Sequence, residues 1–246
     1  MNTNIKFSII TPCYNSEKTI EKTLQCIVSQ VYKNYEYIIV DGGSTDNTMK
    51  IIDRYRDFFG DKLCVISEPD NGIYDAMNKG ICLATGEIVG IVNSDDFYES
   101  DCLYNVLNSY NPDNGEYQIL YGGMRCIDRD GHIMSEVFYH HDYLENQMIN
   151  HPATFVTKKL YDKFGPYDTK YKSSADLDFL LRMKKRNKVV FVPIYKILTN
   201  FMRGGISGSY VGGKETAIVK YKHGIITMKI YLFDRFKIWG KNILKI

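Results

Sequence analysis

The sequence predicts an α/β fold with a central, mostly parallel sheet flanked by helices. Strand-like and helix-like segments alternate through residues 7–98, and a cluster of polar residues follows each predicted strand in this part. The composition is that of a globular protein, with 246 residues, 44% hydrophobic and 24% charged. These values exclude a disordered chain, a fibrous repeat and a multi-span membrane protein.

Four short apolar runs in the amino-terminal part are the predicted strands. They cover residues 7–11, 37–40, 63–66 and 87–92. Between them, apolar residues recur at helical spacing and predict helices over residues 16–31, 46–59 and 73–83, with Ser16 as an N-cap. Strands separated by helices pair in parallel, with helices on both faces of the sheet.

This alternation is lost in the second half of the chain, where no clean linker separates a second independent domain. We expect a hairpin there, then a strand, two helices, a further strand and a glycine-rich loop. These elements are predicted at residues 118–125 with 132–138, then 153–156, 158–163, 175–186, 189–192 and 203–213.

Charge and cysteine usage limit the compartment and the partners. Lys plus Arg number 31 and Asp plus Glu 29, and such a balance argues against a dedicated nucleic-acid binder. The six cysteines form no C-x-x-C pair and are predicted to be reduced, buried thiols. We find neither a secretory signal nor an apolar run of the roughly 20 residues that cross a bilayer. We therefore expect a cytoplasmic protein.

The polar clusters lie where each amino-terminal strand ends, at residues 11–15, 41–46, 70–72 and 93–96. Because open parallel sheets bind ligands outside the carboxyl ends of their strands, one shared site is predicted there. Tyr14 offers a ring for stacking, and Asp41 offers a carboxylate to a base or a ribose. The alternative is a set of ordinary turns, and Asp46 is best interpreted as an N-cap.

Asp95 and Asp96 are the first candidates for chemistry. Adjacent carboxylates repel each other, so a hard divalent cation such as Mn²⁺ or Mg²⁺ would stabilise both ionised forms. Such an ion would hold a diphosphate and neutralise its charge as it leaves. The alternative is an N-cap for a helix near Leu103.

Five segments resemble, in order, the motifs of family 2 glycosyltransferases. They are residues 9–15, 39–46, 70–80, 84–87 and 93–96. Three later segments, at residues 151–155, 175–182 and 203–207, resemble the acceptor half of the same family. The resemblance covers about residues 5–210.

This resemblance implies a Rossmann-like, glycosyltransferase A-type fold that binds a nucleotide sugar and performs an inverting, metal-dependent transfer. It implies a nucleotide-sugar-binding half at residues 1–98 and an acceptor half of the same domain at residues 99–213. By position, the residues implied to contact the donor are Thr11, Pro12 and Tyr14 at the nucleoside, Asp41 at the base, and Asp70 and Lys79 near the nucleotide or diphosphate. Asp96 is the implied leading metal ligand, and Asp95 contacts ribose or the metal.

Asp176 matches the acidic catalytic position of the family and is the predicted general base. Many members carry Glu-Asp there, whereas this chain has Ala175 before Asp176. One carboxylate within reach of the acceptor hydroxyl suffices to remove its proton. The alternative is that Asp176 caps its helix, and for Asp178 with Arg182 we expect only an i, i+4 ion pair.

Two further residues are weaker candidates. His151 is predicted to touch the metal, the diphosphate or the acceptor, although a lone histidine is as readily a packing residue. Arg203 begins the glycine-rich loop at residues 203–213, which we expect to close over the donor with Arg203 near phosphate. The alternative is an exposed connector.

The tail, residues 214–246, is basic and amphipathic. It carries eight Lys or Arg and two acids, a net charge of +6, which leaves −4 for the remainder. Basic residues interleaved with large apolar ones suit an anionic membrane surface. A helix packed on the domain or at a homodimer seam is the alternative.

We therefore expect a bacterial-type transferase that uses a UDP-sugar to extend an O-antigen or other surface polysaccharide on a lipid-linked acceptor. It would act at the inner face of the cell membrane. A sugar-nucleotide nucleotidyltransferase should have glycine in the first loop, but residues 10–17 have none. A phosphatase with an Asp nucleophile needs a second Asp where Gly43 stands. A non-catalytic nucleotide-sugar-binding module remains the third alternative.

Overall fold

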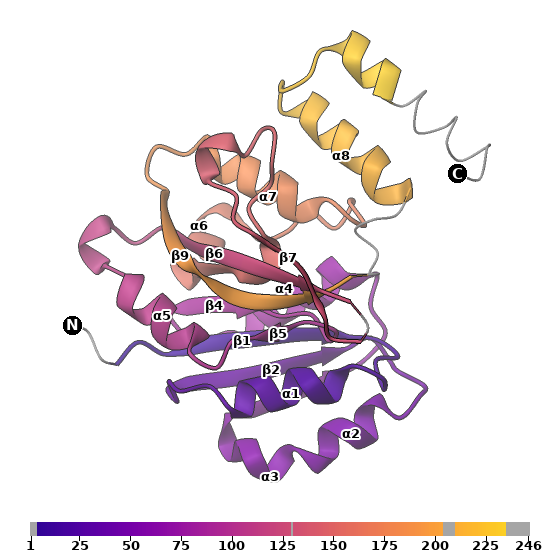
Figure 1. The fold of residues 1–246 in the computed structure, drawn as a ribbon, viewed down its shortest axis with the longest axis vertical. Helices are drawn as coiled ribbons and strands as arrows, with labels where there is room; N and C mark the ends of the chain where they lie inside the picture. The colour runs from indigo at the N-terminus through magenta and orange to yellow at the C-terminus, as the bar shows by residue number, and fades with distance from the viewer. Residues whose placement is uncertain (1–3, 129, 204–209, 235–246) are drawn as a thin grey trace.

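The computed structural model describes residues 4–128, 130–203 and 210–234, and it contains one nine-stranded sheet with helices on both faces (Figure 1). The strand order is β3-β2-β1-β4-β8-β6-β9-β5, with β7 paired to β6. The strands are β1 (Phe7–Cys13), β2 (Tyr35–Asp41), β3 (Leu63–Ser67), β4 (Ile88–Ile91), β5 (Phe97–Tyr98), β6 (Gln118–Ile127), β7 (Ile133–Val137), β8 (Thr154–Thr157) and β9 (Val190–Met202). The predicted α/β fold is thus confirmed.

The helices alternate with the strands in the first half and become less regular afterwards. The α-helices are α1 (Ile20–Val28), α2 (Thr48–Arg54), α3 (Arg56–Phe59), α4 (Ile73–Leu83), α5 (Cys102–Ser109), α6 (Lys158–Phe164), α7 (Ala175–Lys184) and α8 (Tyr210–Lys222). Short 3₁₀ turns are η1 (Gly60–Lys62), η2 (Pro112–Asn114), η3 (His141–Tyr143) and η4 (His151–Ala153).

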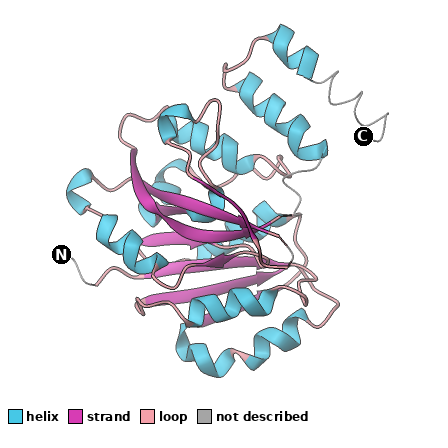
Figure 2. Cartoon of the chain, viewed as in Figure 1, coloured by secondary structure: helices cyan, strands magenta, loops and turns pink. Residues whose placement is uncertain are grey.

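The first four long strands pair in parallel, as predicted, with β1 between β2 and β4 and with β3 beyond β2. All seven residues of β1 are buried, and its side chains alternate between two cores. Phe7 and Ile9 pack with α1, α2 and α5, whereas Ile10 packs with α4, α6 and α7. Such two-sided burial explains the continuous apolar runs. Figure 2 shows the resulting layers of helix, sheet and helix.

Two of the predicted helices differ from those in the structure. The first helix begins at Ile20 because residues 16–19 form a turn, in which the Ser16 carbonyl accepts from the amides of Thr19 and Ile20. The second predicted helix is broken at Tyr55, which separates α2 from α3. Apolar spacing alone therefore extended both helices too far.

The second half adds antiparallel strands to the same sheet. β8 pairs antiparallel with β4 and with β6, and the predicted hairpin of β6 and β7 is confirmed. The strand predicted at 189–192 continues to Met202 and pairs in parallel with β6. A proline such as Pro193 usually ends a strand because it cannot donate a backbone hydrogen bond. Here the pairing of β9 with β6 continues beyond Pro193, with shifts of register after Gly122 and Gly123.

The tail begins with α8, and residues 228–234 are helical too. Within the described chain, no helix is both long and apolar enough to cross a bilayer. Ala217 and Val219 are buried, so α8 packs on the domain. The side chains of Met228, Ile230, Leu232 and Phe233 are 47–66% exposed. Residues 235–246, which hold half of the predicted basic charges, lie outside the described part.

Candidate active site

The loops that follow β1, β2 and β3 converge at the carboxyl end of the sheet. A Cβ added at Gly42, directly after β2, would lie 2.5 Å from Asp70 Oδ2 and 3.4 Å from Tyr14 Cδ2. Tyr14 is 61% exposed, so its ring is available to a ligand. Only glycine leaves room for this approach, and it brings the predicted stacking residue next to the predicted Asp70.

Asp41 is fully buried and holds the loop after β2. Oδ2 accepts from Ser67 Oγ (2.6 Å), Ser44 N (3.0 Å) and Gly43 N (3.2 Å). Oδ1 accepts from the Ser44 hydroxyl. Because both oxygens are occupied, the geometry favours a role in shaping the loop, and direct contact of Asp41 with a base stays a prediction.

Thr11 and Pro12 lie in β1, shortly before Tyr14. Both are buried within β1, and the Tyr37 hydroxyl donates to Thr11 Oγ1 at 2.9 Å. The strand continues through Pro12 to Cys13, two residues beyond the predicted end. Of the three residues predicted to border a nucleoside, Tyr14 is the exposed one.

Asp70 lies in the turn between β3 and α4, and Lys79 lies in α4. Asp70 Oδ1 accepts from Gly72 N at 2.8 Å, and the side chain is half-buried beside Gly42. Lys79 Nζ lies 2.7 Å from Glu68 Oε1 and donates to the Pro69 carbonyl at 3.2 Å. Lys79 therefore braces the turn, and its predicted contact with a diphosphate is not tested.

Asp95 and Asp96 differ sharply in exposure. Asp96 is fully buried; its Oδ1 accepts from Met202 N and its Oδ2 from Asn93 Nδ2, both at 3.0 Å. Asp95 is half-buried. Burial raises the pKa of Asp96, and the neighbouring Asp95 raises it further; burial also raises the pKa of Asp95. Asp95 is thus the more exposed of the two carboxylates, and the leading role at a metal that the resemblance implies for Asp96 stays a prediction.

The residues present fit a hard divalent cation. Asn93 Oδ1 is buried and accepts no hydrogen bond from any described group. The same side chain donates from Nδ2 to Asp96 Oδ2, and its amide oxygen is a further possible metal ligand beside the two carboxylates. Mg²⁺ and Mn²⁺ prefer carboxylate and carbonyl oxygens. Asp95, Asp96 and Asn93 thus form a suitable donor set.

Arg203 directly follows Met202, whose amide donates to Asp96 of this donor set. Its amide donates to the Ile127 carbonyl at 3.0 Å, and its side chain is exposed. Residues 204–209 of the loop predicted as a lid lie outside the described part, so closure over the donor stays an expectation. Residues 210–213, predicted as the end of this loop, belong to α8 instead.

Asp176 lies in the first turn of α7. Its Oδ1 accepts from the Tyr74 hydroxyl at 3.0 Å and from Leu177 N at 2.9 Å. No described group hydrogen-bonds to Oδ2, and the side chain is half-buried. One oxygen is therefore fixed while the other stays available. The expected pair of Asp178 and Arg182 is confirmed at 2.9 Å.

His151 belongs to an aromatic cluster beside Asp176. Its Nε2 lies 2.9 Å from the Tyr167 hydroxyl, and the rings of Tyr74 and Tyr167 have centroids 5.5 Å apart. Burial lowers the pKa of His151, and Asp176 opposes this only in part. A neutral imidazole bound to Tyr167 therefore forms part of the surroundings of Asp176, and contact of His151 with a substrate stays a prediction.

Several residues of the site were not singled out from the sequence. Tyr74 lies in a motif segment, but its bond to Asp176 spans 102 residues. Asn93 lies in the polar cluster at residues 93–96, but its amide oxygen was not predicted as a ligand. Lys172, whose Nζ donates to the Asn71 carbonyl at 2.6 Å, carries no sequence signal.

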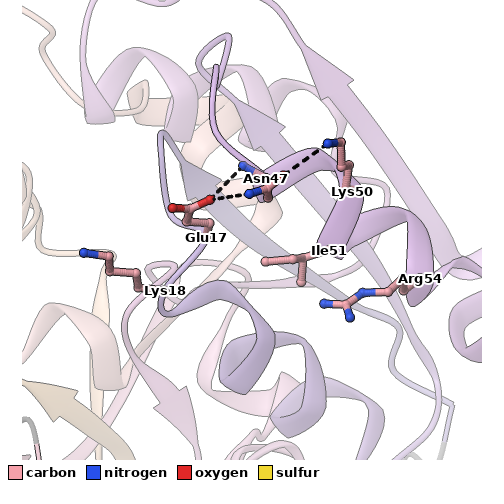
Figure 3. A pocket seen from close by; sticks show the side chains of 6 residues that line it. All are labelled: Glu17, Lys18, Asn47, Lys50, Ile51 and Arg54. Carbon is pink, nitrogen blue, oxygen red and sulfur yellow. Dashed lines mark hydrogen bonds between the residues drawn. The ribbon is translucent and has the colours of Figure 1, made fainter.

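A separate cavity of about 570 Å³ lies between the starts of α1 and α2 (Figure 3). It is lined by Glu17, Lys18, Asn47, Lys50, Ile51 and Arg54. Glu17 Oε2 accepts from Asn47 N (3.0 Å) and Nδ2 (2.8 Å), which joins the two loops. No predicted site residue lines this cavity.

Comparison with known proteins supports the same architecture. The sequence model described as "Glycosyl transferase family 2" matches residues 8–164. The PGL/p-HBAD biosynthesis glycosyltransferase of Mycobacterium bovis (strain BCG / Pasteur 1173P2) is 30% identical, over 83% of this chain and 80% of that protein. The chondroitin synthase of Escherichia coli is 28% identical over 88% of this chain, but only 31% of the synthase is covered.

Two solved structures share the fold. S. aureus TarS 1-349 in complex with UDP-GlcNAc has a TM-score of 0.68 at 22% identity, over 87% of this chain and 66% of that one. The mannosyltransferase PcManGT from Pyrobaculum calidifontis, in complex with GDP-Man and Mn²⁺, has a TM-score of 0.61 at 20% identity, over 89% and 63%. This chain spans 39% of another TarS chain. The family match and the mycobacterial relative show that this chain belongs to glycosyl transferase family 2 and is a glycosyltransferase with a GT-A-like fold.

Proposed function

We propose that this protein is an inverting transferase that moves a sugar from a UDP-sugar to a hydroxyl of a lipid-linked saccharide in surface polysaccharide biosynthesis. The observation that carries the proposal is the state of Asp176. One of its oxygens is fixed by Tyr74, and the other accepts no hydrogen bond from a described group. A positioned carboxylate with one available oxygen suits a general base.

The chemistry is a single displacement. The acceptor hydroxyl attacks the anomeric carbon of the donor from the face opposite the diphosphate, and Asp176 Oδ2 takes the hydroxyl proton as the new bond forms. The bond between the sugar and the diphosphate breaks, and UDP leaves with that electron pair. The hydrogen bond from Tyr74 keeps Oδ1 occupied and so directs Oδ2 to the proton.

Asp95, Asp96 and Asn93 are the residues that would hold Mn²⁺ or Mg²⁺. We assign the direct contact to Asp95, which is accessible, and a supporting role to the buried Asp96. A bound divalent ion supplies charge neutralisation at the diphosphate. The exposed ring of Tyr14, beside Asp70, is suited to the nucleoside.

UDP is the preferred nucleotide because TarS was solved with UDP-GlcNAc, although PcManGT was solved with GDP-Man. A lipid-linked acceptor is supported by the tail. Lys229 lies among the exposed Met228, Ile230, Leu232 and Phe233, and the whole tail has a net charge of +6, a combination that suits an anionic membrane surface. The protein would then act at the cytoplasmic face of the membrane. Packing of this face at a homodimer seam is the competing outcome.

The test is a panel of UDP- and GDP-sugars assayed for nucleotide release with Mn²⁺, with Mg²⁺ and with a chelator. We expect at least one UDP-sugar to be hydrolysed slowly in the presence of metal and faster with a membrane extract as acceptor source. Sedimentation with vesicles of anionic or neutral lipid tests the location. Equal release with metal and with chelator would contradict the proposed metal role, and no release from any donor would contradict the function.

A further inference from the structure

The loop before α7 is held by a carboxylate from another helix. Glu215, on α8, accepts from Lys172 N through both of its oxygens (2.9 Å each) and from Ser173 N (2.7 Å). Ser174, the N-cap residue of α7, makes no side-chain cap bond to its own helix. Its hydroxyl lies 3.2 Å from Thr216 Oγ1 instead. The start of the helix that carries Asp176 is therefore fixed from α8.

The loop before α7 also contacts the turn between β3 and α4, which holds Asp70 and which we call the donor-side turn. Lys172 Nζ donates to the Asn71 carbonyl at 2.6 Å, across 101 residues of sequence. Asn71 lies in the turn that holds Asp70, and a Cβ at Gly72 would lie 3.9 Å from Lys172 Nζ. Lys172 is thus bound to α8 through its amide and to the donor-side turn through its ammonium group.

A second contact fixes the far end of α8. His223 Nε2 lies 2.9 Å from Asp178 Oδ1, and both side chains are at least nine-tenths buried. Asp178 Oδ2 pairs with Arg182 on the same helix. Because α8 is pinned to α7 at two points, the position of Glu215 relative to Asp176 is defined.

We propose that Glu215 is a positioning residue for the transfer reaction. It fixes the loop that presents Asp176 and, through Lys172, the turn that presents Asp70, so it aligns the base with the donor. This inference rests on the proposed function, because it takes Asp176 as the base. A carboxylate with two backbone donors forms charge-assisted hydrogen bonds, which are stronger than neutral ones.

The test compares Glu215→Ala, Glu215→Gln and Lys172→Met with wild type, using UDP release from the most reactive UDP-sugar in Mn²⁺. Glu116→Ala is the matched control, because it removes an exposed glutamate paired only with Lys159. Rates are expressed per UDP-binding site, measured by titration, so that loss of folded protein does not count. We expect Glu215→Ala to lower kcat by about 10- to 100-fold, since small misplacement of a catalytic group has effects of this size.

Lys172→Met should act differently, because it removes only the link to the donor-side turn. We expect a rise in donor KM of about 3- to 10-fold, the size of the usual net contribution of one hydrogen bond, because this bond is exposed; kcat should change less than about twofold. Glu215→Gln keeps one acceptor and should be intermediate. In the double variant Glu215→Ala/Lys172→Met, KM should equal that of Lys172→Met, because both changes break one chain of contacts.

A kcat per UDP-binding site equal to wild type in both Glu215 variants would overturn the proposal. Amide hydrogen exchange supplies a readout that does not need turnover. Glu215→Ala should speed exchange at Lys172, Ser173 and residues 70–72, and unchanged exchange at residues 70–72 would overturn the coupling. If the wild-type protein releases no nucleotide from any donor, the proposed function is wrong. The exchange data then still show whether Glu215 stabilises the turn at residues 70–72.

Discussion

Both ends of the parallel strands carry carboxylates; we call these ends the amino edge and the carboxyl edge of the sheet. Their surroundings have opposite effects on the pKa of those carboxylates. At the amino edge, Glu36 accepts from Lys6 Nζ (2.7 Å), Ser8 Oγ (2.5 Å) and Thr85 N (2.7 Å). Burial would raise the pKa of Glu36, but these donors lower it to about 2. At the carboxyl edge, burial and mutual repulsion raise the pKa of Asp95 and Asp96.

The difference separates carboxylates that stabilise the fold from carboxylates that need a ligand. Lys6 supplies the positive charge that Glu36 requires, so the amino edge is complete within the chain. No described cation pairs with Asp95 or Asp96, and clustered perturbed groups of this kind mark functional sites. The carboxyl edge is therefore the one where a cation and its diphosphate ligand are expected.

Between these two groups of carboxylates, the larger effect on turnover should follow from Asp95→Asn. Loss of the accessible carboxylate should lower metal-dependent UDP release by at least about 100-fold, because a bound ion contributes several kcal/mol to such reactions. The metal-free protein should keep its stability or gain slightly, since repulsion with Asp96 is removed. A nucleotide-release assay measures the first effect, and thermal unfolding with and without Mn²⁺ measures the second. A variant that is still stabilised by Mn²⁺ as much as wild type would remove Asp95 from the metal site.

Glu36→Gln should do the opposite, lowering stability but leaving the kinetics per folded molecule unchanged. The folded-state pKa is about 2 against an ordinary value of 4.5, so the stabilisation is complete above pH 4.5 and is lost as pH falls toward 2. The shift corresponds to about 3 kcal/mol at neutral pH. Urea unfolding at pH 7 and pH 3 checks it: the gap between wild type and variant should shrink at the lower pH, and a constant gap would contradict the assignment.

The smallest effect is expected at Tyr14. Tyr14→Ala should weaken UDP binding about 3- to 10-fold, since aromatic stacking contributes about 0.5–1.5 kcal/mol, while Tyr14→Phe should retain most of the affinity. Calorimetric titration with UDP distinguishes the two variants. Equal affinities for all three proteins would place the nucleoside elsewhere on the carboxyl edge.

The features that could be predicted from the sequence are those that depend on residues close together in the chain. The four parallel strands and α4 were predicted closely because apolar periodicity and turns fix them within a few residues. The continuation of β9 to Met202 was missed because it depends on pairing with β6, more than 70 residues away. Asp176 was identified by its motif position, whereas its partner Tyr74 and the brace at Glu215 required the tertiary structure.

The difference in exposure between Asp95 and Asp96 illustrates the same limit. Two adjacent acids are equivalent in sequence, and only the fold distinguishes the buried one, which receives Met202 N from 106 residues away, from the accessible one. Similarly, Asp41 has the residue type of a ligand contact, but Ser44 and Ser67 occupy its oxygens.

The most direct test of the account is Asp176→Asn, measured for turnover and for UDP binding in the same preparation. Asparagine keeps an oxygen for Tyr74 but cannot accept a proton. We predict that turnover falls by about 10²- to 10⁴-fold, the usual contribution of a general base, while UDP affinity in Mn²⁺ stays within about twofold of wild type. Turnover at the wild-type rate would contradict the central claim that this carboxylate activates the acceptor.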